Sequence, residues 1–170
     1  MNLKPDMYKN NIYNINYKKL FYMKKKYLFF DFDNTIIIYE DNKLSKKNLD
    51  LFKKLKKMGF EGFIISNSNY KRISKVSEQL NIEVYYNSMK PLKKNYRKIL
   101  KKFNREKCAF IGDQLMTDVL GAKRNNLFVI LVDRIGLKEP FTTKMCRLIE
   151  KIFLYNMKKK KIFEKGRYYD

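Results

Sequence analysis

The feature that most restricts the fold of this chain is the alternation of short apolar runs with amphipathic stretches. The apolar runs have the length of strands and lie at residues 27–32, 63–66, 82–86, 108–112 and 127–132. Continuous apolar strands suit a sheet covered on both faces, and helical stretches between successive strands suit parallel pairing. The pattern therefore predicts an α/β fold of Rossmann-like type, a three-layer sandwich around a mainly parallel sheet.

Two of the amphipathic stretches carry helix boundary signals. Ser45 is placed to cap a helix that runs to Met58, and Gly59 follows as the residue after its end. Pro91 is placed at the first position of another helix, whose apolar residues continue at helical spacing to Phe103. Both helices are expected to turn their apolar faces toward the core.

A further amphipathic helix is expected to begin at Thr142 or Thr143 and to lead into a lysine cluster at 158–161, within a basic C-terminal region of about 142–170. Its apolar stripe consists of Met145, Leu148, Ile149, Ile152 and Phe153, and the interleaved basic residues are Lys144, Arg147 and Lys151. Such a helix can pack on its own sheet with solvated lysines, or it can lie against anionic lipid. If it packs, the basic tail alone can still touch lipid.

Composition excludes several kinds of chemistry. The chain has no histidine, which rules out Ser-His-Asp, Cys-His and histidine-nucleophile mechanisms and any histidine-containing zinc site. Cys108 and Cys146 are too few for a disulfide framework and are interpreted as reduced thiols. The 39 basic residues against 17 acidic ones give a net charge of +22, which reflects either the nucleotide composition of the gene or a polyanionic partner.

The 170 residues fit one domain, which we expect to span 1–170. Residues 1–19 lack the apolar core of a signal peptide, and the longest apolar run has six residues, at 127–132. We therefore expect a cytoplasmic protein without a membrane span.

Four polar motifs come in order at predicted strand ends or helix starts. DFDNT at 31–35 follows the first strand, SNS at 66–68 follows the second, Lys90 precedes a helix, and GDQLMTD at 112–118 closes the strand that begins at Cys108. In open α/β sheets, ligands bind at the carboxyl ends of strands, so the two aspartates of DFDNT are placed to face a shared site. Taken alone, DFDNT is also compatible with two aspartates that cap a strand turn.

Together, the motifs resemble those of the haloacid dehalogenase (HAD) superfamily of phosphotransferases over residues 28–118. The resemblance implies that Asp31 is a nucleophile that becomes an aspartyl phosphate, and that Asp33 is the general acid and then the base for the hydrolytic water. A carboxylate nucleophile is already ionised at neutral pH, whereas the leaving alkoxide needs a proton from a second group nearby. Two roles therefore need two aspartates.

The same resemblance implies a Mg²⁺ site, because a phosphate monoester brings negative charge against the nucleophile. Asp31 and Asp113 would bind the ion through their carboxylates and Asp33 through its backbone carbonyl, an all-oxygen set that suits Mg²⁺. The residues expected to hold the phosphoryl group are Ser66, Asn67 and Lys90.

Three residues have further expected roles by this resemblance. Lys90 would take part in catalysis by neutralising Asp31 and the phosphoryl oxygens. Thr35 would contact the site residues without touching the substrate itself. For Asp118 three interpretations stay open: it binds a metal-coordinated water, it orients Lys90, or it is a favourable acidic residue in the first turn of a helix.

Short spacings between the motifs leave no room for a cap domain. Between Thr35 and Ser66 lie 30 residues, 14 of them in the helix expected at 45–58, and between Ser66 and Lys90 lie 23 residues, which one helix and one strand use up. We therefore predict a capless phosphoryl pocket that stays open to solvent and accommodates a large substrate or one fixed in a surface.

A narrower resemblance extends over nearly the whole chain. LKPDMY at 3–8, DFDNT at 31–35 and GDQLMTDVLG at 112–121, with Arg124 following, are similar to the YqeG family of class IIIA HAD phosphatases. That family resembles organellar phosphatidylglycerophosphate phosphatases, which produce phosphatidylglycerol. The chain departs from the pattern at Ala122, where glycine is more usual, and in its lysine-rich helices.

The resemblance implies a Mg²⁺-dependent phosphomonoester hydrolase of phospholipid biosynthesis, with phosphatidylglycerophosphate as expected substrate. Its partner would be an anionic phospholipid headgroup, with peripheral contact at the inner face of the membrane. Two alternatives remain: a HAD phosphatase that acts on a soluble phosphate or a nucleic-acid end, and a basic non-catalytic module that binds nucleic acid or the ribosome. No nucleic-acid-binding motif is recognisable, so no specific nucleic acid is predicted as a partner.

Overall fold

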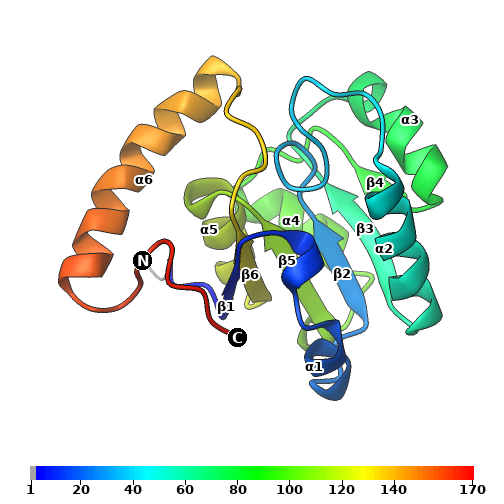
Figure 1. The fold of residues 1–170 in the computed structure, drawn as a ribbon, viewed down its shortest axis with the longest axis horizontal. Coiled ribbons are helices and arrows are strands. Elements are labelled where there is room, and N and C mark those ends of the chain that lie inside the picture. The colour runs from blue at the N-terminus through cyan, green and yellow to red at the C-terminus, as the bar shows by residue number, and fades with distance from the viewer. Residues whose placement is uncertain (1–2) are drawn as a thin grey trace.

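A six-stranded sheet forms the centre of the structure, a computed structural model that describes residues 3–170 (Figure 1). All neighbouring strands pair in parallel, in the spatial order β1-β6-β5-β2-β3-β4. The strands are β1 (Met7–Lys9), β2 (Tyr27–Phe30), β3 (Glu61–Ile65), β4 (Glu83–Tyr85), β5 (Cys108–Gly112) and β6 (Phe128–Val132). The predicted α/β fold with a parallel sheet is confirmed, and the five predicted strands are all present.

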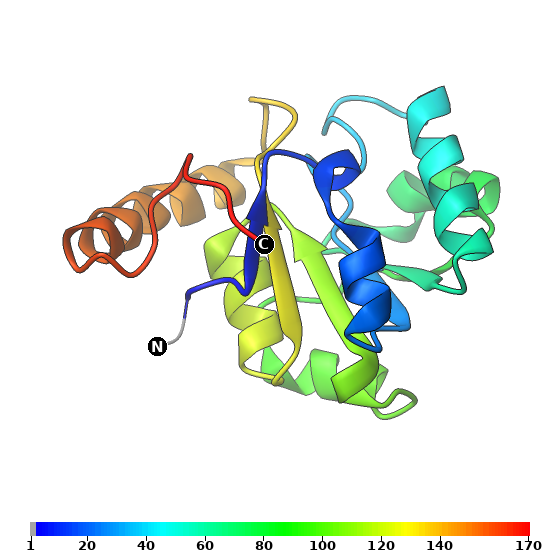
Figure 2. The ribbon, with the colours of Figure 1, turned by 60° about the horizontal axis from the view of Figure 1, so that its bottom comes forward.

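Helices cover both faces of the sheet, which confirms the expected three layers (Figures 1 and 2). The helices are α1 (Tyr17–Tyr22), α2 (Lys46–Lys57), α3 (Tyr70–Leu80), α4 (Lys93–Leu100), α5 (Leu120–Lys123) and α6 (Phe141–Lys159), with short turns η1 (Ile12–Asn14), η2 (Arg105–Lys107) and the π-helical η3 (Leu115–Val119). Successive strand residues point to opposite faces. Leu28 and Phe30 therefore belong to the core under α1, α2 and α3, whereas Phe29 belongs to the core under α4, η3 and α5.

Helix α2 has the boundaries that its sequence signals predict. The Ser45 hydroxyl oxygen accepts a hydrogen bond from the Asn48 amide at 3.1 Å, which caps the first turn. Gly59 has a φ of +88°, the left-handed conformation that commonly follows the last residue of a helix.

Helix α4 begins at Lys93 and not at Pro91 as predicted. The reason is a turn before the helix, in which the Leu92 amide donates to the Met89 carbonyl at 2.9 Å. Leu92 is consequently half exposed, whereas the remaining apolar residues of the predicted stripe are buried or packed against the core: Tyr96, Ile99, Leu100 and Phe103.

Strand β1 comes from an N-terminal segment whose packing the sequence did not indicate. It pairs with β6, where Met7 lies opposite Ile130. On its other side, Tyr8 exchanges two backbone hydrogen bonds with Tyr169, at 2.9 and 3.0 Å. The beginning and the end of the described chain therefore lie side by side at one edge of the sheet (Figure 2).

Helix α6 leaves most of the apolar stripe near the C-terminus exposed, which does not agree with the alternative in which this stripe packs on the sheet. The helix begins at Phe141, before the predicted Thr142 or Thr143, and lies beside the sheet (Figure 1). Four stripe residues, Met145, Leu148, Ile149 and Ile152, are 44% to 64% exposed. The inward positions are taken by charged residues described below, so only Phe153 of the stripe packs against the core. Among residues 3–170, no helix combines the length and the apolar character needed to cross a bilayer.

The loops that follow β2 and β3 are short. Between β2 and α2 the chain forms a flap, residues 36–44, without a helix or named strand, and within the described chain only α3 lies between β3 and β4. The expectation of a capless fold is therefore confirmed.

Candidate functional site

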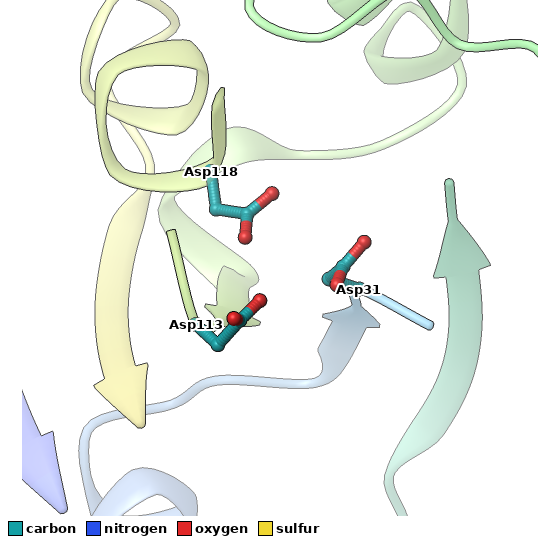
Figure 3. A group of neighbouring side chains, drawn as sticks. All are labelled: Asp31, Asp113 and Asp118. Atoms are coloured by element: carbon teal, nitrogen blue, oxygen red, sulfur yellow. The ribbon is translucent and has the colours of Figure 1, made fainter. Parts of the chain in front are cut away.

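Three buried aspartates meet at the carboxyl edge of the sheet (Figure 3). Asp31 directly follows β2 and Asp113 follows β5, and because these strands pair in parallel, both carboxylates reach the same edge. Asp118 joins them from η3. One oxygen from each aspartate lies within 4.8 Å of those of the other two. The structure thus brings Asp31 and Asp113 together as the motifs predict.

Lys90 lies between two of these aspartates. Its Nζ is 2.5 Å from Asp31 Oδ1 and 2.7 Å from Asp118 Oδ1, and only 2% of its side chain is exposed. Asn67 holds the backbone of Lys90 from both sides: its Oδ1 accepts from the Lys90 amide at 2.7 Å, and its Nδ2 donates to the Lys90 carbonyl at 3.2 Å. The Asn67 side chain therefore positions Lys90 and also lines the cleft described below. Asp118 contacts Lys90 directly.

Asp33 is partly exposed and is held by residues from the chain after β3. The Ser68 hydroxyl donates to Asp33 Oδ2, and Arg72 Nη2 lies 2.9 Å from Asp33 Oδ1. The Asp33 side chain is 19% exposed. Its carboxylate is thus fixed in direction and still reachable from solvent.

Thr35 and Ser66 are buried hydroxyls beside the aspartates. Thr35 Oγ1 is 3.2 Å from Asp31 Oδ2 and 3.4 Å from Asp113 Oδ1, so its proton can be donated to either carboxylate. Ser66 Oγ accepts a hydrogen bond from the Ser68 amide at 3.0 Å. This bond leaves the Ser66 proton available to a ligand.

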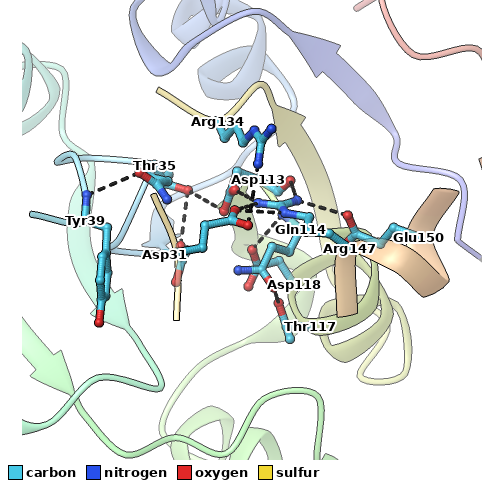
Figure 4. A network of polar contacts seen from close by, with 12 residues as sticks. Asp31, Thr35, Tyr39, Asp113, Gln114, Thr117, Asp118, Arg134, Arg147 and Glu150 are labelled. Carbon is cyan, nitrogen blue, oxygen red and sulfur yellow. Dashed lines mark hydrogen bonds and ion pairs between the residues drawn. The ribbon is translucent and has the colours of Figure 1, made fainter. Parts of the chain in front are cut away.

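Arg147 on α6 binds the end of β5 (Figure 4). Its Nη2 pairs with Asp113 Oδ2, and its Nη1 donates to the Asp113 backbone carbonyl at 2.9 Å. The same guanidinium pairs with Glu139 at 2.9 Å and with Glu150 at 3.0 Å. Glu150 in turn accepts from the Met116 amide at 3.1 Å. The inward face of α6 therefore carries charged residues that bind Asp113 and η3.

Burial and mutual repulsion shift the protonation of the cluster. Burial raises the pKa of Asp31 to about 8; Lys90 acts against this rise, and Asp118 and Asp113 add to it. Burial likewise raises the pKa of Asp113 to about 7, with Arg147 opposing. Burial lowers the pKa of Lys90, but Asp118 and Asp31 outweigh it and leave that pKa above its usual value.

The donor set fits a divalent cation. Within residues 3–170, the three aspartates are paired with Lys90 and Arg147, and Arg147 is shared with two glutamates. The buried negative charge is therefore undercompensated, and an added cation would favour the ionised carboxylates. Oxygen ligands are those that hard cations such as Mg²⁺ prefer.

Gly112 allows Asp118 its position. A Cβ atom at Gly112 would lie 2.5 Å from Asp118 Oδ2, closer than real Cβ contacts come. The same carboxylate oxygen accepts from the Gln114 amide at 3.1 Å. A residue with any side chain at position 112 would displace Asp118 from both the amide and Lys90.

A cleft of about 450 Å³ opens at Asp31 and Asp33. Asp31, Asp33, Ser66 and Lys90 line its base, and residues of α6, Thr142, Thr143 and Cys146, line one wall. Most of the residues that the motifs predict for the site thus line the cleft. The motifs did not predict the wall that α6 forms.

Asn34 ties the rim of the cleft together. Its Oδ1 accepts from the Tyr39 amide of the flap at 3.2 Å, and its Nδ2 donates to the Lys138 carbonyl at 3.0 Å. Its backbone carbonyl accepts from the Ile135 amide at 3.0 Å. The flap and the loop that precedes α6 are therefore joined through one residue.

Arg72 and Arg147 are the main site residues that the sequence analysis missed. Among 39 basic residues 32 are lysines, so the few arginines differ from the compositional background. A planar guanidinium pairs with carboxylates through several N–H groups at once, which lysine cannot do. Arginine in a lysine-rich chain is thus the signal that could have found them, whereas the partners Ser68, Glu139 and Glu150 carry no such signal.

Comparison with known sequences agrees with this geometry. Residues 36–126, just over half of the chain, match the sequence model of the haloacid dehalogenase-like hydrolase family. Over 158 residues the chain is 33% identical to the Bacillus subtilis protein described as "Probable phosphatase YqeG", and the match covers 92% of both proteins.

Solved structures show the same fold. A YrbI family phosphatase from Pseudomonas syringae has a TM-score of 0.52 at 19% identity, over 79% of this chain and 90% of that one. The cobalt-bound deoxy-D-mannose-octulosonate 8-phosphate phosphatase from Haemophilus influenzae has a TM-score of 0.50 at 15% identity, over 88% of this chain and 97% of that one. These structures share the fold, and the family-model match and the sequence match to YqeG confirm the expected resemblance. The chain belongs to the haloacid dehalogenase-like hydrolases and is a phosphatase of that family.

Proposed function

We propose that the protein is a Mg²⁺-dependent phosphomonoester hydrolase in which Asp31 accepts the phosphoryl group. The observation that carries the proposal is the buried contact of Asp31 with Lys90, which is itself held by Asp118 and Asn67 at the base of an open cleft. A nucleophilic carboxylate needs such a cation to approach an anionic phosphate.

Asp31 and Asp113, with the backbone carbonyl of Asp33, would hold the Mg²⁺ ion, which when bound would neutralise charge on the phosphoryl oxygens and on Asp31. The Ser66 hydroxyl, whose proton has no acceptor within residues 3–170, would donate to a phosphoryl oxygen. Lys90 would neutralise a second oxygen.

The proton transfers fall to Asp33. In the first step Asp31 attacks phosphorus, the bond to the leaving oxygen breaks, and protonated Asp33 gives that oxygen its proton. In the second step Asp33 takes a proton from a water molecule that attacks the aspartyl phosphate, which releases phosphate and restores Asp31. Ser68 and Arg72 keep Asp33 aimed into the cleft.

For the substrate we propose a phosphate monoester on an anionic phospholipid headgroup, with phosphatidylglycerophosphate as the specific compound. The cleft has no cap, so a group fixed in a membrane surface can reach Asp31. A net charge of +22 favours approach to an anionic surface. The 33% identity with YqeG extends over most of the chain and supports the resemblance from which the substrate is inferred.

The test compares two conservative variants. Asp31→Asn keeps the shape of the side chain and removes the nucleophile, whereas Asp50→Asn makes the same change at an exposed position of α2. The assay measures phosphate release with Mg²⁺ from phosphatidylglycerophosphate in mixed micelles and from soluble phosphates. We expect release to fall to background in Asp31→Asn and to stay at the native rate in Asp50→Asn. Turnover that survives in Asp31→Asn would remove the nucleophile assignment, and a preference for a soluble phosphate would remove the lipid substrate.

A further inference from the structure

Over residues 141–152, the outward side of α6 is more apolar than its inward side, the reverse of an ordinary surface helix. Its apolar residues recur every three or four positions and are 44% to 76% exposed: Phe141, Met145, Leu148, Ile149, Ile152 and Tyr155. We call these six residues the outer face of α6. The inward positions include Arg147 and Glu150, which are bonded to the end of β5 and to η3. Because the site uses the polar side, the apolar side is left facing solvent.

The exposed charged residues beside the outer face are basic, whereas the two acidic residues near it, Glu139 and Glu150, are buried and paired with Arg147. Glu150 is the single acidic residue of α6, and it is 4% exposed and paired with Arg147. Lys144 and Lys151 lie on α6 beside the outer face, and Lys165 lies across a groove of about 400 Å³ that Leu148 also lines. Within residues 3–170, none of these three lysines forms a salt bridge.

These observations favour one occupant. A second copy of the chain would place the same unpaired lysines opposite these ones. Each copy has a net charge of +22, so the two copies would repel each other. An anionic bilayer offers both an apolar layer for the exposed side chains and negative headgroups for the lysines. We propose that the outer face of α6 docks the protein on an anionic phospholipid bilayer. The proposal deepens the function proposed above and rests on it for its purpose, because a docked enzyme meets lipid-borne substrate.

The docking helix is also part of the cleft. Thr142, Thr143 and Cys146 line the cleft from the first turns of α6, and the outer face begins beside them at Phe141. Docking through this helix would therefore hold the mouth of the cleft near the lipid headgroups. Arg147 links the same helix to Asp113.

Two double variants test the surface, each with a matched control. Leu148→Gln with Ile152→Gln removes apolar area. Tyr22→Gln with Met23→Gln does so at two exposed residues, the last residue of α1 and the one that follows it. Lys144→Glu with Lys151→Glu reverses two charges. Lys53→Glu with Lys57→Glu does so on α2, on the opposite side of the molecule (Figure 1). All eight positions are exposed, so each variant is expected to fold.

The measurement is co-sedimentation of the full chain with vesicles of phosphatidylglycerol and phosphatidylcholine. Because each lysine near an anionic surface and each buried apolar side chain contributes on the order of 1 kcal/mol or more, both α6 variants should lower the bound-to-free ratio about tenfold or more. The controls should stay within about twofold. Hydrolysis of para-nitrophenyl phosphate with Mg²⁺, a soluble substrate, should be the same in all four variants.

Several results would overturn the docking proposal. One is vesicle binding that is unchanged in both α6 variants. Another is binding lost in the lysine variant alone, which would mean that the surface only attracts polyanions. A third is a native dimer, seen by sedimentation velocity without lipid, that Leu148→Gln with Ile152→Gln dissociates. Absence of para-nitrophenyl phosphate hydrolysis in a native protein that still binds vesicles through α6 would instead count against the proposed function and support docking.

Discussion

Arg147 holds Asp113 at two points, through its carboxylate and, at 2.9 Å, through its backbone carbonyl, although the two residues belong to different elements. Because Glu139 and Glu150 pair with the same guanidinium, one residue of α6 compensates three buried carboxylates. The position of an expected metal ligand thus depends on a helix outside the motifs.

Replacing Arg147 by Met should strongly destabilise the protein. The change leaves buried carboxylates without a cation, which typically costs about 3–5 kcal/mol, and we expect the free energy of unfolding to fall by that amount in urea titrations. Arg134→Met is the control, since Arg134 is partly exposed and pairs with Glu139 at 3.5 Å. It should cost less than about 1 kcal/mol. Equal losses in the two variants would contradict the role assigned to Arg147.

Gly112→Ala should disturb Asp118 and, through it, Lys90. The added methyl group would meet Asp118 Oδ2 at 2.5 Å, so we expect a loss of about 1–3 kcal/mol in unfolding free energy and a fall in kcat. Gly62→Ala in β3 is the control, because its nearest neighbour would lie at 3.5 Å, an ordinary contact. If Gly112→Ala kept native kcat, Asp118 would not be needed to position Lys90.

Without metal, the stability of the protein should fall as the pH rises. Burial raises the pKa of Asp31 to about 8 in the folded chain, above its ordinary value of 3.8. Between these values the folded state binds more protons than the unfolded state, so the free energy of unfolding decreases with pH. Urea titrations in EDTA from pH 5 to 8 should show a decline of up to about 1 kcal/mol per pH unit. The decline should be weaker in Asp31→Asn, and an equal decline there would contradict the assignment.

Mg²⁺ should stabilise the folded protein through the aspartate cluster. A ligand that binds only the folded state adds stability with its concentration, about 2.7 kcal/mol at a hundred times its Kd. We expect Mg²⁺ to raise the midpoint of thermal unfolding of EDTA-treated protein, and Asp113→Asn to abolish the rise. Asp50→Asn should respond as the native chain does. The same rise in Asp113→Asn would place the bound ion elsewhere.

Sequence patterns predicted those parts of the structure that local physics determines. The apolar runs marked five strands, and the polar motifs at strand ends marked the carboxyl edge of the sheet as the site. The resemblance of these motifs to a known family then marked Asp31, Asp113 and Lys90 as neighbours, which the structure confirms. The boundaries of α2 could be predicted from Ser45 and Gly59, because the hydroxyl cap and the left-handed glycine are both local features of the chain.

Features set by distant partners escaped the sequence analysis. The periodicity of α6 showed that it is amphipathic, but it could not show which side faces the protein. That depends on Arg147 reaching Asp113, 34 positions away along the chain. Likewise, β1 is a strand of three residues that forms against β6, and no local pattern specifies that pairing. The contact of Asn67 with the Lys90 backbone was missed in the same way, because it joins two loops that are 23 positions apart along the chain.

The hydrogen bonds of Asn34 have a consequence for turnover. Since Asn34 joins the flap to the loop before α6, these two sides of the entrance near Asp31 are bonded to each other. We therefore expect reactants to enter and inorganic phosphate to leave without a lid that must first open.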